Sequence, residues 1–341
     1  MAGSPRIAVL GTGANGASIG ADLTRAGHDV TFIEQWPAHV EAMRERGIRV
    51  EMPDRAEVTP VRVHHLCEVA ELRERFDLVF LLVKAYDTRW ACELIRPLLA
   101  DDGLVVGVQN GMTVDDIADV VGPHRTIGAV IEVSSNMFEP GVVERQSPPE
   151  RSWFAVGGIH PATEGRAEAV AEVLRAAGTV ELSADIRSSK WMKLVANAAE
   201  LVPSAILDLP LGDAVRLPGM RESMVETGRE AIRTCLDAGN RLMPIFGMTE
   251  ADVAEPDRYA VRLLDTVLEE YTLPTTRTTV LQDWMKGRRS EVEEINGLVV
   301  REQERLGGAA PRNRRVVELA REIESGLRTA SPDNLADLTR P

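Results

Sequence analysis

Ile7-Ala8-Val9-Leu10-Gly11-Thr12-Gly13-Ala14-Asn15-Gly16 places a short apolar run directly before a glycine-rich turn, and an amphipathic helix pattern follows over residues 17–26. A strand, a G-x-G-x-x-G turn and a helix in this order are typical of a dinucleotide-binding unit. The first glycine permits a sharp turn, the second lets the backbone approach a pyrophosphate, and the third lets the helix pack closely on the strand. We therefore expect a bound dinucleotide to contact this turn through Gly11, Thr12, Gly13, Ala14, Asn15 and Gly16.

A second apolar run, Val30-Thr31-Phe32-Ile33, ends on Glu34. An acidic residue about 20 positions after the glycines accepts hydrogen bonds from the adenosine ribose of NAD. The same carboxylate would repel the 2′-phosphate of NADP, and no Arg or Lys lies between Glu34 and Val40 to neutralise that phosphate. The sequence therefore favours NAD over NADP. The alternative interpretation of Glu34 is a solvated charge at the end of a strand.

Three further apolar runs, at residues 76–83, 104–108 and 126–131, are typical of strands buried on both faces of a parallel sheet. Polar residues follow each run. Because ligands in open α/β sheets bind at the carboxyl ends of the strands, Lys84 and Asn110 are candidates for contact with the cofactor. A charge that ends a strand and a simple Asn-Gly turn are the alternatives.

The length of 341 residues predicts two domains. Residues 1–183 predict an α/β Rossmann domain with a doubly wound, mostly parallel sheet. Residues 184–330 predict an all-α domain, because nearly every pattern there is helical, and residues 331–341 predict a loose C-terminal tail. The expected helices of the second domain lie at residues 185–201, 220–238, 257–270, 279–284, 291–306 and 313–327.

Charge and composition narrow the partners. The net charge of −14 disfavours nucleic acid and anionic membrane surfaces, and no apolar run is long enough to cross a bilayer. The three cysteines show no metal-ligand spacing and fit a reduced cytoplasmic compartment. A small carboxylate substrate stays compatible with this charge, because a pocket can be locally basic. Apolar faces of several C-terminal helices fit a dimer interface as easily as the core of the domain itself, and we expect a homodimer.

The second half of the chain contains a polar pair on a helix that is otherwise apolar. Lys193 and Asn197 stand four residues apart, so they share one helix face and can address one small ligand. Together with other short motifs, this pair resembles the ketopantoate reductase family from residue 7 to about residue 325. The motifs are Gly11-x-Gly13-x-x-Gly16, Val83-Lys84-Ala85, Gln109-Asn110-Gly111, Trp191-x-Lys193-Leu194-x-x-Asn197 and Ser290-Glu291-x-Glu293-x-Ile295-Asn296-Gly297.

The resemblance implies a reaction and roles for individual residues. Lys193 matches the family's catalytic lysine, a general acid that protonates the alkoxide formed when hydride reaches a ketone carbon, and Glu291 matches its active-site glutamate. By the same resemblance, Asn110 and Asn197 bind cofactor or substrate, and Thr279 falls where the family has a substrate-binding Ser. The alternatives are a surface lysine at Lys193 and, at Glu291, a glutamate in the first turn of a helix.

The chain also departs from the family pattern. Members usually carry a second Asn one turn beyond the first, where this chain has Leu201, and Glu200 beside it adds a possible acceptor or base. Members usually use NADPH, against which Glu34 counts. We therefore expect an NAD-linked oxidoreductase of this family that acts on another 2-keto or 2-hydroxy acid. Two alternatives stay open: an NADPH-dependent 2-dehydropantoate 2-reductase, and a dinucleotide-binding sensor without catalysis.

Overall fold

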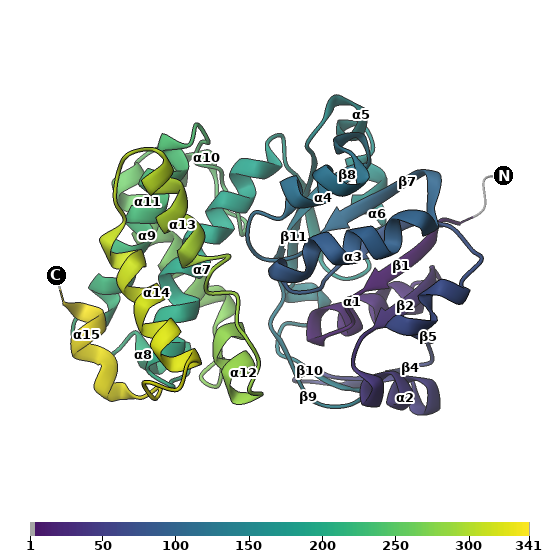
Figure 1. Ribbon diagram of the computed structural model, residues 1–341, viewed down its shortest axis with the longest axis horizontal. Coiled ribbons are helices and arrows are strands. Elements are labelled where there is room, and N and C mark those ends of the chain that lie inside the picture. The colour runs from purple at the N-terminus through teal and green to yellow at the C-terminus, as the bar shows by residue number, and fades with distance from the viewer. Residues whose placement is uncertain (1–3, 341) are drawn as a thin grey trace. The chain divides into compact units, whose positions relative to one another are not determined.

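The computed structural model describes residues 4–340, and the chain forms two compact units (Figure 1). The first unit ends at Arg187 and the second begins at Ser188. The boundary expected from the sequence, at residue 183, lies within a few residues of this division.

A mostly parallel sheet forms the centre of the first unit, with strand order β12-β11-β8-β7-β6-β1-β2-β5. Every neighbouring pair is parallel except β8 and β11, which are antiparallel. β1 lies between β2 and β6. The chain therefore adds strands first on one side of β1 and then on its other side, as in a doubly wound fold. The strands are β1 (Arg6–Leu10), β2 (Asp29–Glu34), β5 (Arg62–His65), β6 (Phe76–Leu81), β7 (Leu99–Gly107), β8 (Thr126–Glu132), β11 (Trp153–Gly158) and β12 (Thr179–Leu182).

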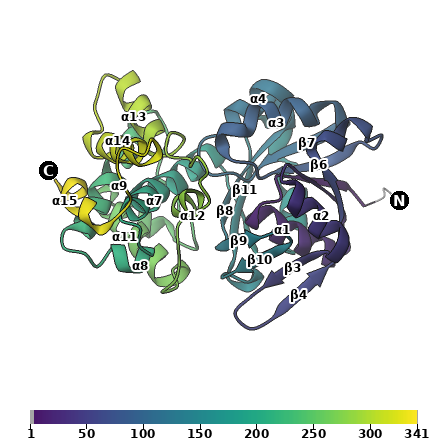
Figure 2. The same cartoon turned by 60° about the horizontal axis from the view of Figure 1, so that its bottom comes forward.

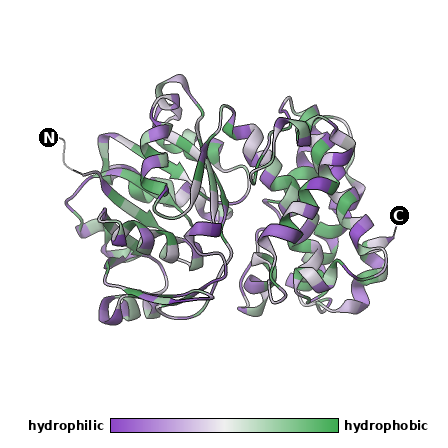
Figure 3. Cartoon of the chain, turned by 180° about the vertical axis from the view of Figure 1, so that it is seen from behind, coloured by the Kyte–Doolittle hydropathy of each residue, from purple (hydrophilic) through white to green (hydrophobic). Residues whose placement is uncertain are grey.

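Alternate residues of the central strands enter two different apolar cores. In β1, Ile7 and Val9 face the core that contains α1 (Ala14–Arg25) and α6 (Ala167–Leu174). Ala8 and Leu10 face the core with α3 (Thr88–Ile95) and α4 (Val114–Val121). Burial on both faces explains why these strands are continuous apolar runs in the sequence, and Figure 3 shows the strands as largely hydrophobic.

A second sheet of four short strands, which the sequence patterns did not predict, packs on α1 (Figure 2). Its order is β4-β3-β10-β9, and α1 contacts both this sheet and strands β1 and β2 of the large one. α1, the helix that follows the glycine turn, therefore lies between two sheets. The strands are β3 (Ile48–Glu51), β4 (Ala56–Thr59), β9 (Ser135–Glu139) and β10 (Val142–Arg145).

Short helices connect the other elements of this unit. They are α2 (Pro37–Arg46), α5 (Pro161–Glu164) and the 3₁₀ turns η1 (Leu66–Glu71), η2 (Ala85–Asp87), η3 (Arg96–Leu98), η4 (Pro123–Arg125) and η5 (Pro149–Arg151).

Helices make up the second unit, whose described residues contain no strand. They are α7 (Ile186–Ile206), α8 (Leu211–Ala214), α9 (Met220–Asp237), α10 (Glu250–Val253), α11 (Pro256–Thr266), the π-helical turn η6 (Val267–Tyr271), α12 (Thr279–Met285), α13 (Asn296–Arg305), α14 (Pro311–Glu324), η7 (Pro332–Asn334) and α15 (Leu335–Thr339). α9 contacts α11, α13, α14 and α15. This arrangement confirms the predicted combination of a Rossmann-like domain and an all-α domain.

Two expectations about the second unit are wrong. The helix expected from residue 291 begins at Asn296, and Glu291 precedes it in a turn. The C-terminal segment expected to be loose forms η7 and α15 instead. Its Leu338 is buried, and the hydroxyl of Ser223 on α9 donates to the Leu338 carbonyl at 2.8 Å, so the segment belongs to the helical unit.

Within residues 4–340, no helix is both long and apolar enough to cross a membrane. Cys92 and Cys235 are buried and Cys67 is exposed, and none of the three forms a disulfide.

Candidate active site

The three motif glycines have different surroundings. A Cβ atom on Gly11, whose φ is +91°, would lie 2.5 Å from the Val83 nitrogen, and one on Gly16 would lie 2.1 Å from the Gly11 oxygen. A Cβ on Gly13 would meet nothing within 4 Å. The fold itself therefore requires the first and third glycines. The second borders open space, as expected where a pyrophosphate approaches the backbone.

The start of α1 is suited to an anion. Gly13 is the N-cap and offers no side-chain cap, and the first turn carries no acidic residue. The first N–H groups and the positive end of the helix dipole therefore favour a phosphate there. Asn15 in this turn accepts a hydrogen bond from the hydroxyl of Ser135, at the start of β9. These features fit a dinucleotide, so the predicted contacts along residues 11–16 are sterically and electrostatically reasonable.

Glu34 is bound to the glycine turn itself. One of its carboxylate oxygens accepts from the backbone N–H of Thr12 at 2.7 Å and from the Thr12 hydroxyl at 2.9 Å. The other accepts from the Trp36 N–H at 2.9 Å, and the side chain is buried. Glu34 is thus not the solvated charge of the alternative interpretation. Sequence reasoning missed this second role, in which it fixes the turn.

His39 completes the support of Thr12. The N–H of Gly141 donates to His39 Nδ1 at 2.8 Å, so the ring proton lies on Nε2, which donates to the Thr12 carbonyl at 2.9 Å. Burial lowers the pKa of His39, although Glu34 and the Thr12 carbonyl oppose this effect. His39 is fully buried and neutral in this role. Nothing in the sequence around His39 indicated it.

Hydrogen bonds of Gln109 connect the segments that follow the carboxyl ends of β6 and β7. Its amide nitrogen donates to the carbonyl of Val83 at 3.0 Å, to the carbonyl of Lys84 at 3.4 Å and to the hydroxyl of Thr88 at 2.8 Å. Since Val83 also contacts Gly11, the structure brings Lys84 and Asn110 to the edge of the sheet that carries the glycine turn. Both side chains are half-buried.

In the helical unit, Lys193 lies on α7 with its ammonium nitrogen 5.1 Å from the centroid of the Phe246 ring. Asn197, one turn further on, is completely buried. Positions 193, 197 and 201 recur every four residues, so Leu201 continues the same face of the helix.

Glu291 meets α7 at Lys190, one turn before Lys193. Burial lowers the pKa of Lys190 to about 8, and the negative charge of Glu291 partly offsets that effect. Both side chains are buried. The lysine on which the charge of Glu291 acts is therefore Lys190, which lies directly before the motif that begins at Trp191 and was not among the predicted site residues.

α12 reaches α7 near Leu201. The Thr278 hydroxyl donates to the Leu201 carbonyl at 2.9 Å, and Thr279 is the first residue of α12. The buried hydroxyl oxygen of Thr279 has no hydrogen-bond partner in the described structure. A substrate oxygen or nitrogen would satisfy it, which agrees with the position of Thr279 in the family pattern.

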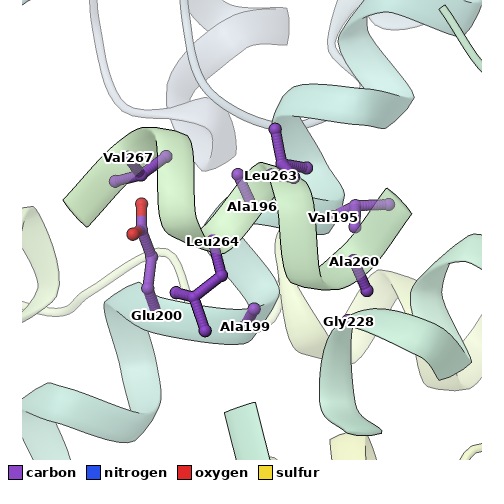
Figure 4. A pocket seen from close by; sticks show the side chains of 9 residues that line it. All are labelled: Val195, Ala196, Ala199, Glu200, Gly228, Ala260, Leu263, Leu264 and Val267. Carbon is purple, nitrogen blue, oxygen red and sulfur yellow. The ribbon is translucent and has the colours of Figure 1, made fainter. Parts of the chain in front are cut away.

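Glu200 follows Lys193 on α7 by seven residues, which is two helical turns, so it lies near the same face of the helix. It lines a narrow hollow that is too small for a water molecule, and the other lining residues are apolar or glycine (Figure 4). These come from α7 itself, α9, α11 and the start of η6, and they are Val195, Ala196, Ala199, Gly228, Ala260, Leu263, Leu264 and Val267. The predicted substrate role of Glu200 is compatible with its position beside Lys193 and Asn197, and it stays a prediction.

A buried polar network braces α7 beside Asn197. The Asn296 amide donates to the Ala198 carbonyl at 3.0 Å and to the Asn313 side chain at 2.9 Å, and Asn313 donates to the carboxylate of Glu230 at 3.0 Å. All three polar side chains are buried. The motif Asn296-Gly297 therefore has a structural function as the support of this helix.

Known proteins agree with this geometry. Residues 7–157 match the family model "Ketopantoate reductase PanE/ApbA", and residues 185–324 match "Ketopantoate reductase PanE/ApbA C terminal". The 2-dehydropantoate 2-reductase of Archaeoglobus fulgidus is 32% identical, over 94% of this chain and 99% of its own length.

Solved structures show the same fold. The PanE/ApbA family ketopantoate reductase of Ralstonia eutropha has a TM-score of 0.78 and 30% identity, covering 94% of this chain and 99% of its own. A D-mandelate dehydrogenase solved with NADH and anilino(oxo)acetate has a TM-score of 0.84 at 20% identity, covering 94% of this chain and 99% of its own.

The fold and the glycine turn define an oxidoreductase that uses NAD(P) and acts on a CH–OH group. This chain belongs to the ketopantoate reductase family. Family membership leaves no support for the interpretation as a sensor without catalysis.

Proposed function

We propose that this enzyme transfers hydride between C4 of a nicotinamide and the carbonyl or carbinol carbon of a small 2-keto or 2-hydroxy acid, with NAD as its preferred cofactor. The observation that carries the proposal is the face of α7. There the Lys193 ammonium lies over an aromatic ring, the buried amide of Asn197 follows one turn later, and Glu291 acts on the same helix at Lys190.

The bound cofactor supplies or accepts the hydride. In reduction, the Lys193 ammonium stabilises the negative charge that develops on the carbonyl oxygen and donates a proton to it. In oxidation, the neutral amine accepts that proton. Asn197, Asn110 and Thr279 hold the substrate by hydrogen bonds. The negative charge of the buried Glu291 carboxylate balances the positive charge of Lys190 on α7.

Glu34 supports the preference for NAD. Its carboxylate is buried at the end of β2, directly beside the glycine turn. A 2′-phosphate brought to this point would face the negative charge of Glu34, whereas a ribose hydroxyl could donate to the carboxylate.

Leu201 supports a substrate other than ketopantoate. When a polar site lacks one of the donors that would pair with a substrate group, its binding free energy weakens by about 1–3 kcal/mol. Leu201 offers an apolar wall in place of that donor, which favours a 2-keto acid with a larger or more apolar side chain.

The second candidate is an NADPH-dependent 2-dehydropantoate 2-reductase. The similarity to relatives of that name favours it, since the Archaeoglobus fulgidus protein matches 94% of this chain. It requires that Glu34 tolerate the 2′-phosphate and that Leu201 replace the usual Asn without loss.

One experiment separates the two candidates. The purified enzyme is assayed with ketopantoate and a panel of other 2-keto acids, each with NADH and with NADPH, by the absorbance of the reduced nicotinamide. Our proposal predicts a higher kcat/KM with NADH and a preferred acid other than ketopantoate. Highest kcat/KM for ketopantoate with NADPH establishes the second candidate.

We further propose a cytoplasmic homodimer. Large apolar side chains of the helical unit are exposed, among them Leu236, Met285, Leu306 and Leu327, and covering such side chains would favour association. Sedimentation equilibrium tests this proposal, because a single species of monomer mass at micromolar concentration would contradict it.

A further inference from the structure

Phe246 adopts a backbone conformation that its side chain disfavours. Its φ is +59°, and that of Gly247 is +74°. The Met248 N–H donates to the Ile245 carbonyl at 3.0 Å, so these two residues are the central pair of a tight turn. A turn with two left-handed central residues favours Asn or Gly at the first of them, and a bulky residue there carries strain.

The surroundings hold the ring despite this strain. Phe246 is 5% exposed, and its ring centroid lies 5.3 Å from that of Tyr271 with the planes tilted by 50°. The segment before the turn is anchored as well, since the Tyr259 hydroxyl donates to the Met243 carbonyl at 2.9 Å. Strained residues that persist in this way occur frequently where the side chain has a function.

The ring is in contact with the proposed acid–base group. The Lys193 ammonium nitrogen lies 5.1 Å from the Phe246 centroid, within the distance of about 6 Å at which the negative face of an aromatic ring attracts a cation. A lysine side chain has four rotatable bonds, so an ammonium without such a contact would occupy many positions. The aromatic face limits those positions.

We propose that Phe246 is a positioning residue, which holds the ammonium group of Lys193 by a cation–π contact where it can protonate the substrate. The strain of the turn at residues 245–248 is maintained because it brings this ring to Lys193. This inference rests on the proposed acid–base function of Lys193.

The test weakens the ring's negative face without changing its shape. Phenylalanine with one, two or three ring fluorines is incorporated at position 246, and kcat and KM are measured with NADH and the 2-keto acid that is turned over fastest in the panel. We expect kcat to fall stepwise with each fluorine, by about 3- to 20-fold over the series. The dissociation constant of NADH and the melting temperature stay constant.

Substitutions provide the second arm. Phe246→Leu keeps an apolar side chain but removes the ring face, so it lowers kcat by a similar factor, whereas Phe246→Tyr retains the ring face and stays close to wild type. The same fluorinated series at Phe138, an exposed residue of β9, is the matched control and leaves kcat unchanged. A kcat that is constant across the Phe246 series overturns the inference.

Lys193→Ala separates this inference from the proposed function. If Lys193→Ala is inactive and the Phe246 series is flat, only the role of Phe246 is wrong. If Lys193→Ala retains wild-type turnover, the proposed function of Lys193 is wrong, and the role of Phe246 fails with it.

Discussion

Glu34 accepts hydrogen bonds from both the backbone N–H and the hydroxyl of Thr12, so the acidic residue that ends β2 also shapes the glycine turn after β1. With the Thr12 carbonyl bound by His39, every polar group of Thr12 is held by β2 or α2. The conformation of the turn is therefore fixed by the protein before any cofactor arrives.

Replacement of Glu34 by Gln should weaken NADH binding. The amide retains an acceptor oxygen but loses the charge, and hydrogen bonds to charged groups contribute about 1.5–3 kcal/mol each. We expect the dissociation constant of NADH, measured by fluorescence titration, to rise by about tenfold or more, with a smaller rise for NADPH. Glu45→Gln, at an exposed carboxylate, is the control. An unchanged ratio of the two constants would show that Glu34 does not select the cofactor.

The glycines at positions 13 and 16 should respond differently to alanine. In Gly16→Ala the new Cβ collides with the Gly11 carbonyl, so we expect a loss of about 1–3 kcal/mol or more in the free energy of unfolding. In Gly13→Ala the Cβ enters open space, so stability is nearly retained, but the pyrophosphate is displaced and NADH affinity falls at least about tenfold. Wild-type affinity in Gly13→Ala would place the cofactor elsewhere.

His39 should make the protein less stable in mild acid. Its pKa is lowered in the folded state by burial, so below about pH 6.5 the unfolded chain binds a proton that the folded chain resists. Stability therefore falls as the pH drops through this value and levels off below the folded-state pKa. Urea unfolding from pH 7.5 to pH 5 measures the effect. His39→Gln should reduce this slope, whereas His124→Gln, at an exposed position, should preserve it. Equal slopes in wild type and His39→Gln would contradict the neutral, buried state of His39.

Lys190 should make the protein more stable in mild alkali, so stability rises with pH here as well. Its pKa is about 8 in the folded state, below its ordinary value because of burial. Between about pH 8 and pH 10.5 the unfolded chain holds a proton that the folded chain has lost, so stability rises with pH, by roughly 3 kcal/mol at most. Lys190→Met removes this contribution. Titratable groups that both proteins share cancel in the difference between their free energies of unfolding. A difference in unfolding free energy that does not change from pH 7 to pH 10 would refute the lowered pKa.

The sequence predicts the elements whose residues act locally. Gly11 and Gly16 are required by contacts within the turn and its neighbouring strand, and the central strands are apolar runs because both faces are buried. The polar pair Lys193 and Asn197 follows from helical spacing alone. Each of these features is determined by residues that are close together in the sequence, so a short stretch is enough to predict it.

Features that depend on distant partners could not be predicted in this way. β3 and β4 are four-residue strands whose partners include β10, far along the chain, so neither gives a recognisable pattern. The role of His39 depends on its hydrogen bonds with Thr12 and Gly141, and the electrostatic environment of Lys190 depends on Glu291. The helix expected at Glu291 starts later because residues 291–295 form turns, although their apolar spacing resembles that of a helix.

The most direct measurement is the turnover of Lys193→Ala with NADH and the preferred 2-keto acid, together with its NADH dissociation constant. The account predicts that kcat falls by about 10²- to 10⁴-fold, because proton transfer is lost, while NADH binding stays close to wild type. Lys286→Ala, at the end of α12, serves as the matched control and retains its activity. Wild-type turnover by Lys193→Ala would contradict the account.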